Sequence, residues 1–308
     1  MKTVVAAILI LMFCIRGGEP IPEVSSGEIR RLSSFPSAFI SSRNVDIWLP
    51  AGYTADKEYD VLYMHDGQML FDDNITWNKQ EWGVDEVASA LMRDGEVRDF
   101  IVVGIWNGGS EYRTIEYFPQ TPFESIEKVK QDSILSVFRS NEQFKLADKP
   151  MSDRYLKFLV KELKPHVDST FSTNQGRENT FVAGSSYGGL ISLYAICEYP
   201  EVFGGAACIS THWPGTFDTK NNPIPDVFLS YMREHLPDPA THKIYFDYGT
   251  ATLDSLYPPI QQKADQIMKE KGFKKGKNWV TKKYEGAAHT ETDWNARLAV
   301  PVTFLFGK

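Results

Sequence analysis

The residue with the strongest chemical signature is a serine between two glycines. Ser186 is the third residue of Gly184-Ser185-Ser186-Tyr187-Gly188, which follows an apolar run at 180–183 and precedes a helical pattern. Between a strand and a helix, such a segment predicts a sharp turn that exposes the serine hydroxyl. The helix dipole there favours developing negative charge. We predict Ser186 as a nucleophile. Ser185 occupies the wrong position, and a plain glycine-rich turn is the alternative interpretation.

A nucleophilic serine needs a base, and the chain contains six histidines. In enzymes with such a turn the order is serine, acid, histidine, which excludes the two histidines that precede Ser186. His289 follows the last predicted strand, residues 279–284, in a loop of small residues that can bring it to the serine. We predict His289 as the base, and His212, which follows another predicted strand, is the alternative. The other two are interpreted as surface residues: His235 and His242.

A carboxylate must hold the imidazole in the correct tautomer and stabilise its charged form. Asp254 lies in the loop after the predicted strand 243–248, where the chain order requires the acid. Asp247 competes for this role, but it precedes the loop glycine Gly249, and we expect it to lie within the strand. The alternative role of Asp254 is to stabilise a helix N-terminus.

Two N–H groups must stabilise the oxyanion of the reaction. The first predicted donor is the backbone N–H of Tyr187, directly after the nucleophile. The second should come from the loop after an early strand, where His65-Asp66-Gly67-Gln68 supplies a turn. We predict the N–H of Gln68, with Gly67 as the alternative. An ordinary β-turn also explains this segment.

Other side chains at predicted strand ends could contact a substrate, because aromatic rings stack on rings and sugars. The residues predicted to bind substrate are Trp106, Arg113, His212 and Trp213, with Trp82 and Asn107 as weaker candidates. Packing is the alternative role for each. The sequence contains no cluster of His and Cys with the spacing of metal ligands, and we predict neither a metal nor a cofactor.

The elements that must position these residues alternate between strand and helix. The predicted strands are 44–49, 60–64, 100–106, 180–183, 206–210, 243–248 and 279–284, and the predicted helices are 84–92, 155–167, 190–197 and 260–268. This alternation predicts an α/β fold with a mostly parallel sheet and helices on both faces. Residues 107–150 are rich in turn formers and charge, so we predict a long irregular insertion there.

Composition limits the class of protein. The 308 residues are 42% hydrophobic, and no break divides residues 28–308, so one large domain is expected. The net charge is −7 and no basic run carries aromatics, which argues against a nucleic-acid partner.

The N-terminus has the pattern of an export signal. A lysine followed by the apolar run Thr3–Phe13 predicts a signal peptide at 1–18 and a domain at 19–308. We expect a periplasmic or secreted protein without a membrane partner once the signal is removed. The run is short for a membrane span, although an uncleaved anchor is the alternative. A lipid anchor at Cys14 fits less well, because the preceding Met12 and Phe13 are bulky.

These motifs together resemble the esterase D and enterochelin-esterase-like branch of the α/β-hydrolases, which includes feruloyl and acetyl-xylan esterases and mycolyltransferases. The resemblance covers about residues 28–306. It rests on His65-Asp66-Gly67-Gln68, Arg113-x-x-Glu116-Tyr117-x-Pro119, Gly184-Ser185-Ser186-Tyr187-Gly188-Gly189, Tyr245-Phe246-Asp247-Tyr248-Gly249-Thr250 and His289-x-Glu291-x-x-Trp294.

The resemblance implies an α/β-hydrolase fold, with Ser186 and His289 as nucleophile and base and with no metal. Asp254 matches less closely, because its spacing from Gly249-Thr250 is longer than in the feruloyl esterases. The implied activity is hydrolysis of a carboxylic ester through an acyl-enzyme. The substrate is a small-molecule ester, such as a siderophore ester, or a feruloyl or acetyl ester linked to plant polysaccharide. A non-catalytic binding protein on the same fold is the third possibility.

Overall fold

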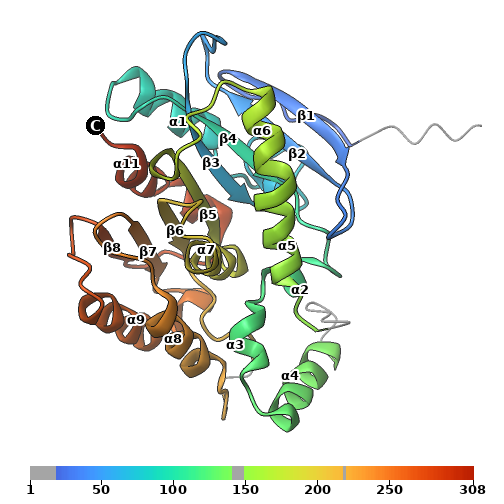
Figure 1. The fold of residues 1–308 in the computed structure, drawn as a ribbon, viewed down its shortest axis with the longest axis vertical. Coiled ribbons are helices and arrows are strands. Elements are labelled where there is room, and N and C mark those ends of the chain that lie inside the picture. The colour runs from blue at the N-terminus through green and yellow to red at the C-terminus, as the bar shows by residue number, and fades with distance from the viewer. Residues whose placement is uncertain (1–18, 141–148, 218–219) are drawn as a thin grey trace, which may run out of the picture.

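The computed structural model describes residues 19–140, 149–217 and 220–308, so the predicted signal peptide and Cys14 lie outside the described residues. A sheet of eight strands runs through the described part, in the order β1-β2-β4-β3-β5-β6-β7-β8 (Figure 1). The strands are β1 (Glu28–Phe35), β2 (Arg43–Leu49), β3 (Asp60–His65), β4 (Phe100–Ile105), β5 (Thr180–Ser185), β6 (Gly205–Ile209), β7 (Lys243–Gly249) and β8 (Trp279–Tyr284).

The sheet is parallel from β4 to β8, whereas β1 and β2 pair antiparallel at one edge. Every residue of β3, β4, β5 and β6 is buried, because helices cover both faces of the central strands. This explains why these strands read as continuous apolar runs in the sequence. The predicted α/β fold with a mostly parallel sheet is confirmed, and every predicted strand matches within two residues.

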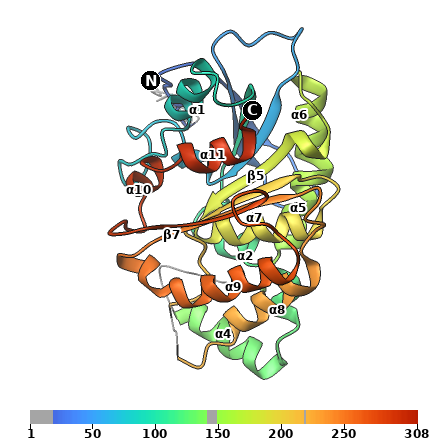
Figure 2. The ribbon, with the colours of Figure 1, turned by 90° about the vertical axis from the view of Figure 1, so that its left-hand side faces the viewer.

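Helices form a layer on each face (Figures 1 and 2). Alternate residues of β3 enter different cores: Val61 and Tyr63 belong to the core that includes residues of α7, α8 and α9, whereas Leu62 and Met64 belong to the core that includes residues of α1 and α11. The helices are α1 (Val84–Arg93), α2 (Arg113–Tyr117), α3 (Gln120–Glu124), α4 (Lys128–Ser140), α5 (Ser152–Phe158), α6 (Lys164–Thr170), α7 (Tyr187–Glu198), α8 (Ile224–His235), α9 (Pro258–Glu270), α10 (Glu291–Asn295) and α11 (Ala299–Phe306). None of these described helices has the length and apolar character needed to cross a bilayer.

The prediction of an irregular insertion at 107–150 is wrong, because this segment contains α2, α3 and α4. The helices α2 and α3 are short, and contacts with distant parts of the chain stabilise them more than their local sequence does. In α2 the buried Glu116 accepts two hydrogen bonds from Arg43 of β2, at 2.7 and 2.8 Å. In α3 the backbone N–H and the hydroxyl of Thr121 contact the hydroxyl of Tyr194 in α7. The insertion is therefore anchored to β2 and α7.

The predicted helix 155–167 is present but contains a wider turn. A π-turn, η2 (Leu159–Leu163), joins α5 to α6. Pro165 has no N–H to donate to the carbonyl oxygen four residues earlier, which accounts for the locally altered hydrogen bonding. The helical column continues past the proline to Thr170, beyond its predicted end.

Candidate active site

The chain makes a sharp turn at Ser186, between β5 and α7. The φ and ψ angles of Ser186 are 58° and −119°, a conformation that L-residues rarely adopt. Its backbone N–H donates to the carbonyl oxygen of Ile209 in β6 at 3.0 Å, and its carbonyl oxygen accepts from the N–H of Gly189 at 3.0 Å. The tertiary structure therefore holds the strained turn in place. Ser186 is 8% exposed, so solvent reaches the residue.

Gly184 is required by the tightness of this turn. A Cβ atom at this position would lie 2.9 Å from the backbone of Gly188, closer than side-chain atoms approach a backbone. The two glycines of the pattern thus touch each other across the turn. This strand–turn–helix geometry is that of the elbow predicted for residues 184–188.

The base and the acid of the prediction lie in direct contact. The Nδ1 atom of His289 is 2.5 Å from Oδ1 of Asp254, which lies in the short helix η4 (Thr252–Leu256). The backbone N–H of His289 also donates to the Thr252 hydroxyl at 2.8 Å. Two contacts therefore tie the histidine loop to the acid loop.

Both loops open on the same side as the elbow. Because β5, β6, β7 and β8 are neighbouring parallel strands, the loops after them meet at one edge of the sheet. Within the described residues, the Ser186 hydroxyl makes no hydrogen bond to His289. Such catalytic hydrogen bonds are often long in enzymes without substrate. The structure thus brings Ser186, His289 and Asp254 to one edge.

The second carboxylate oxygen of Asp254 is also fully engaged. Its Oδ2 accepts from the N–H of Gly249 at 2.6 Å and from the hydroxyl of Ser210 at 2.5 Å. Burial alone would raise the pKa of Asp254, but hydrogen bonds from His289, Ser210 and Gly249 hold it below its usual value. Asp254 is therefore a buried carboxylate held in its charged form.

Asp247 does not contact His289. It lies within β7, as expected, and its carboxylate contacts Arg297 at 3.1 Å and the hydroxyl of Tyr245 at 3.0 Å. Burial raises the pKa of Asp247 to about 6. Of the two candidate acids, the structure brings only Asp254 to the base.

His212 lies next to the elbow but has no carboxylate partner among the described residues. Its backbone N–H donates to the carbonyl oxygen of Ser186 at 3.2 Å, and its Nδ1 contacts the hydroxyl of Tyr257 at 3.0 Å. The side chain is buried, which lowers its pKa to about 3. His212 is therefore a neutral, buried neighbour of the site, whereas the ring of His289 is 14% exposed.

The predicted oxyanion loop lies beside the elbow. A Cβ atom at Gly188 would lie 3.5 Å from Cβ of His65, where β3 ends. A Cβ atom at Gly67 would lie 2.4 Å from the carbonyl carbon of Gly104, so only glycine fits there. Gln68 follows within the 3-10 turn η1 (Gly67–Met69), and its side-chain oxygen accepts from the N–H of Asn107 at 3.2 Å.

Arg113 holds this loop rather than standing free. Its Nε and Nη2 atoms donate to the two carboxylate oxygens of Asp66, each at 2.7 Å. Asn107 donates to the same carboxylate at 2.7 Å, and the hydroxyl of Tyr117 accepts from the Asp66 N–H at 3.3 Å. Asp66 has a φ of 58°, so these contacts fix a conformation that is unfavourable by itself. The motif residues Arg113 and Tyr117 thus anchor the loop to α2, whereas Glu116 anchors α2 to Arg43 of β2.

A family model described as "Putative esterase" matches residues 37–305. The chain belongs to this esterase family. Its feruloyl- and carboxylesterase relatives accord with a serine ester hydrolase, and the non-catalytic alternative has no support. The esterase is 25% identical over 295 residues to an endo-1,4-beta-xylanase/feruloyl esterase of Xylanibacter ruminicola, covering 92% of this chain and 32% of that one. It is 22% identical over 275 residues to YbbA of Bacillus subtilis, covering 87% of this chain and 94% of that one.

Solved structures share the fold of the esterase. An IroE-like serine hydrolase from Shewanella oneidensis has a TM-score of 0.64 at 19% identity, with 91% of this chain and 80% of that chain covered. A ferulic acid esterase has a TM-score of 0.62 at 17% identity, with 91% and 98% covered. An enterobactin esterase from Shigella flexneri has a TM-score of 0.59 at 17% identity, with 92% and 60% covered. The α/β-hydrolase fold is confirmed.

Three tryptophans of the esterase that the sequence suggests as substrate contacts are engaged in packing. The indole N–H of Trp106 donates to Asp46 at 2.7 Å, and Arg31 lies over its ring. Trp213 is entirely buried, and its indole N–H donates to Gln261 at 2.9 Å. Trp82 is also buried, and its ring centroid lies 5.2 Å from that of Trp294. These contacts favour the packing role that the sequence left open for each.

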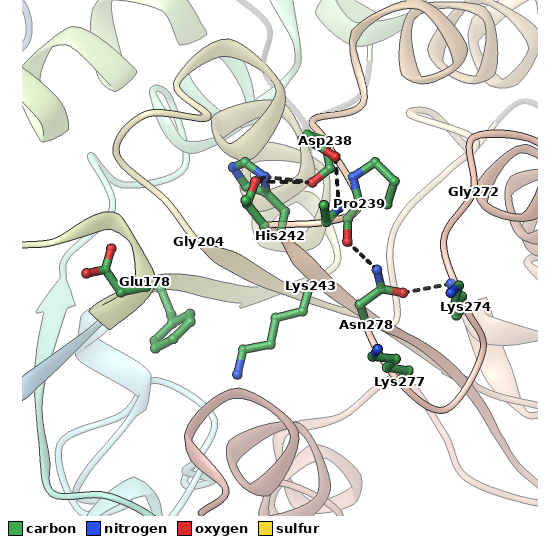
Figure 3. A pocket seen from close by; sticks show the side chains of 13 residues that line it. Glu178, Gly204, Asp238, Pro239, His242, Lys243, Gly272, Lys274, Lys277 and Asn278 are labelled. Atoms are coloured by element: carbon green, nitrogen blue, oxygen red, sulfur yellow. Dashed lines mark hydrogen bonds between the residues drawn. The ribbon is translucent and has the colours of Figure 1, made fainter.

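A cavity of about 660 Å³ lies at the opposite edge of the sheet, near the amino ends of β6 and β7 (Figure 3). His242 lines it, and its interpretation as a surface residue is wrong. The ring is buried, with Nδ1 3.0 Å from the carbonyl oxygen of Asp238 and Nε2 2.8 Å from that of Pro200. Since Ser186 follows the carboxyl end of β5, this cavity is separate from the edge that carries Ser186, His289 and Asp254. The described residues contain no cluster of three or more metal-ligating side chains.

Proposed function

We propose that Ser186, His289 and Asp254 form the catalytic triad of this ester hydrolase. The observation that carries the proposal is the 2.5 Å contact between Asp254 and His289 beside the elbow that holds Ser186. Asp254 holds the proton of the imidazole on Nδ1, which leaves Nε2 as the base that accepts the proton of the serine hydroxyl. No other carboxylate contacts His289 among the described side chains.

The proposed reaction proceeds through an acyl-enzyme. The Ser186 oxygen attacks the ester carbonyl carbon, and the backbone N–H groups of Tyr187 and Gln68 stabilise the oxyanion. His289 then donates its proton to the leaving alcohol. In the second half, His289 removes a proton from water, which attacks the acyl carbon and releases the acid and the free serine.

We further propose that the substrate is a siderophore ester, with a feruloyl or acetyl ester on plant polysaccharide as the second candidate. One similar structure is an enterobactin esterase in the presence of 2,3-dihydroxy-N-benzoyl-glycine, and another is a ferulic acid esterase in complex with ferulic acid. Both acids carry a hydroxylated aromatic ring. The exposed aromatic side chains of Tyr112 and Phe217 follow β4 and β6, where they can receive such a ring.

A panel of esters tests the substrate proposal. The purified protein is assayed with a catecholate siderophore ester, methyl ferulate and p-nitrophenyl acetate, and kcat/KM is compared. We expect the highest kcat/KM with the siderophore ester. A higher value with methyl ferulate than with the siderophore ester assigns the second candidate, whereas p-nitrophenyl acetate, whose leaving group is activated, reports ester hydrolysis alone. Absence of turnover with all three, by folded protein, would remove the proposal of an ester-hydrolysing triad.

We also propose that residues 1–18 are a signal peptide and that the enzyme acts in the periplasm or outside the cell. The support is the pattern of a lysine followed by an apolar run at Thr3–Phe13. The mass of the protein from culture medium and periplasm should correspond to a chain that begins near Glu19. A full-length chain in the membrane fraction would contradict cleavage, and a lipid adduct at Cys14 would indicate an anchor.

A further inference from the structure

Ser210 occupies an unusual position next to the acid. It directly follows β6, is entirely buried, and has a φ of 41°, in the left-handed region that favours glycine. A serine at such a position costs stability compared with glycine, unless its side chain forms compensating contacts. Apart from Cβ, the hydroxyl is all that distinguishes this serine from a glycine. The contacts of that hydroxyl therefore suggest its role.

Three groups converge on the Ser210 hydroxyl. Its Oγ lies 2.5 Å from Oδ2 of Asp254, 2.7 Å from Nη2 of Arg297 and 3.0 Å from the indole nitrogen of Trp294. An arginine and an indole can only donate hydrogen bonds. They occupy the two lone pairs of the hydroxyl, so its single proton is directed to Asp254. The direction of this hydrogen bond is thus fixed by the partners.

Arg297 adds positive charge to this arrangement. Its Nη2 is 3.1 Å from Oδ1 of Asp247 and 3.9 Å from Oδ2 of Asp254. The side chains of Arg297 and Asp247 are almost completely buried, so solvent screens this charge weakly. The cation polarises the Ser210 O–H bond and strengthens the hydrogen bond to Asp254.

Trp294 links the same hydroxyl to the base. Its ring lies against the His289 ring, with centroids 4.9 Å apart in a T-shaped arrangement. The atom that binds the acid is therefore also connected to the side chain that packs against the imidazole. The Ser210 hydroxyl therefore contacts Asp254 directly and His289 through Trp294.

We propose that Ser210 is a positioning residue of the triad, which donates its hydroxyl proton to Asp254 and thereby leaves Oδ1 to bind His289. The inference rests on the proposed function of Ser186, His289 and Asp254. With Ser210 and Gly249 on Oδ2, the carboxylate cannot rotate without losing two hydrogen bonds. The charged form of Asp254 is stabilised in the orientation that the base requires.

The test is the variant Ser210→Ala, with activity expressed per folded enzyme. We expect kcat to fall by about 10- to 100-fold, as for the loss of one hydrogen bond to a charged group, with little change in KM. The Asp254–His289 pair should bind a proton more tightly. The acidic limb of the kcat/KM profile should therefore move to higher pH, by about 0.5–1 unit.

A matched control separates this effect from a loss of stability. Ser152→Ala removes another entirely buried serine, whose hydroxyl accepts from the N–H of Gln120 at 2.9 Å and forms no hydrogen bond to Asp254 or His289 in the described structure. We expect it to lower the melting temperature without moving the pH profile. If Ser210→Ala does not fold, Ser210→Gly provides the same test, because a φ of 41° suits glycine.

A double variant shows whether Ser210 acts through the acid. In an Asp254→Asn background, Ser210→Ala should reduce kcat by less than about twofold, because the carboxylate that it positions is absent. A single variant with the kcat and pH profile of the wild type overturns the inference while the triad stands. Full additivity in the double variant also overturns it. Wild-type activity in Ser186→Ala would instead overturn the proposed triad itself.

Discussion

Two arginine–aspartate pairs flank the elbow, and they differ in burial and geometry. On the side of β6 to β8, Arg297 contacts Asp247 at 3.1 Å, with side chains only 3% and 0% exposed. On the side of β3 and β4, Arg113 binds Asp66 through two bonds of 2.7 Å, with side chains 25% and 12% exposed. In the first pair, Arg297 lies 3.9 Å from the carboxylate of Asp254, whereas the second pair holds the predicted oxyanion loop.

The difference shows how one site combines a rigid part with an adaptable part. On the acid side, both charges are buried, and removing one would leave the other uncompensated at a large cost in folding free energy. On the oxyanion side, the Arg113 side chain is 25% exposed, so water can partly solvate Asp66 once the arginine is removed, and we expect a smaller loss of stability than on the acid side. Loss of the Arg297–Asp247 pair is thus expected to lower mainly the free energy of unfolding. Loss of the Arg113–Asp66 pair is expected to lower mainly kcat.

The largest contrast is expected between the two histidines near the elbow. His289→Ala should lower kcat by about 10⁴- to 10⁶-fold, because the base is lost. His212→Ala should reduce kcat far less, because its imidazole is buried and has no carboxylate partner in the described structure. Steady-state kinetics on p-nitrophenyl acetate measures both. A reversed order would identify His212 as the base.

The next contrast concerns the two candidate acids. Asp254→Asn should lower kcat by about 10³- to 10⁴-fold with little change in KM, because an amide favours the wrong tautomer of His289. Asp247→Asn should leave kcat within about tenfold, because this carboxylate does not contact the base. If both variants stay within tenfold of the wild type, the enzyme works as a serine–histidine pair.

The two arginines test the comparison itself. Arg297→Ala should reduce the free energy of unfolding by about 3–5 kcal/mol, because it leaves Asp247 buried without its partner. Arg113→Ala should lower kcat about 10- to 100-fold through the loosened loop, with a loss of stability of about 1 kcal/mol. Urea denaturation and kinetics on each variant measure both quantities. Equal stability losses would show that the two sides do not differ as described.

Much of this site could be predicted from sequence because its chemistry lies in local patterns. The elbow around Ser186 follows from two glycines that touch at its base, and the position of His289 follows from chain order. The assignment of their catalytic roles, and that of Asp254, stays a prediction. Ser210 carries no motif, and only the folded chain shows that two distant segments, one with Asp254 and one with Trp294 and Arg297, meet at its hydroxyl.

The missed elements have physical reasons as well. The strand β1 pairs along one edge only and is mostly solvent-accessible, so its residues carry no apolar run. The helix α11 is apolar on all sides and shows no helical period. The short helices α2 and α3 depend on contacts such as Arg43–Glu116, which sequence spacing cannot show.

A further expectation concerns the pH dependence of stability. Burial lowers the pKa of His65, on the oxyanion side, and of His212, on the acid side, to about 3. The unfolded chain binds protons at these residues with a pKa of about 6.5, whereas the folded chain does not. Their contribution is therefore fully present above about pH 6.5 and is lost progressively as the pH falls towards 3.

The free energy of unfolding of the wild type should fall between pH 7 and pH 5. In the variants His65→Gln and His212→Gln this fall should be smaller. Urea midpoints at the two pH values give this difference, whatever the change in absolute stability. His235→Gln, on the exposed end of α8, is the matched control. An unchanged pH dependence in both buried variants would contradict the view that these histidines stay neutral in the folded protein.

We expect Ser186 to be the nucleophile that His289 and Asp254 activate. The most direct measurement is peptide mass spectrometry after reaction with a fluorophosphonate. The account predicts one adduct, located on Ser186, together with loss of esterase activity. It predicts no adduct in Ser186→Ala and slow labelling in His289→Ala. An adduct on Ser185, or an active wild-type enzyme that takes up no label, would contradict the account.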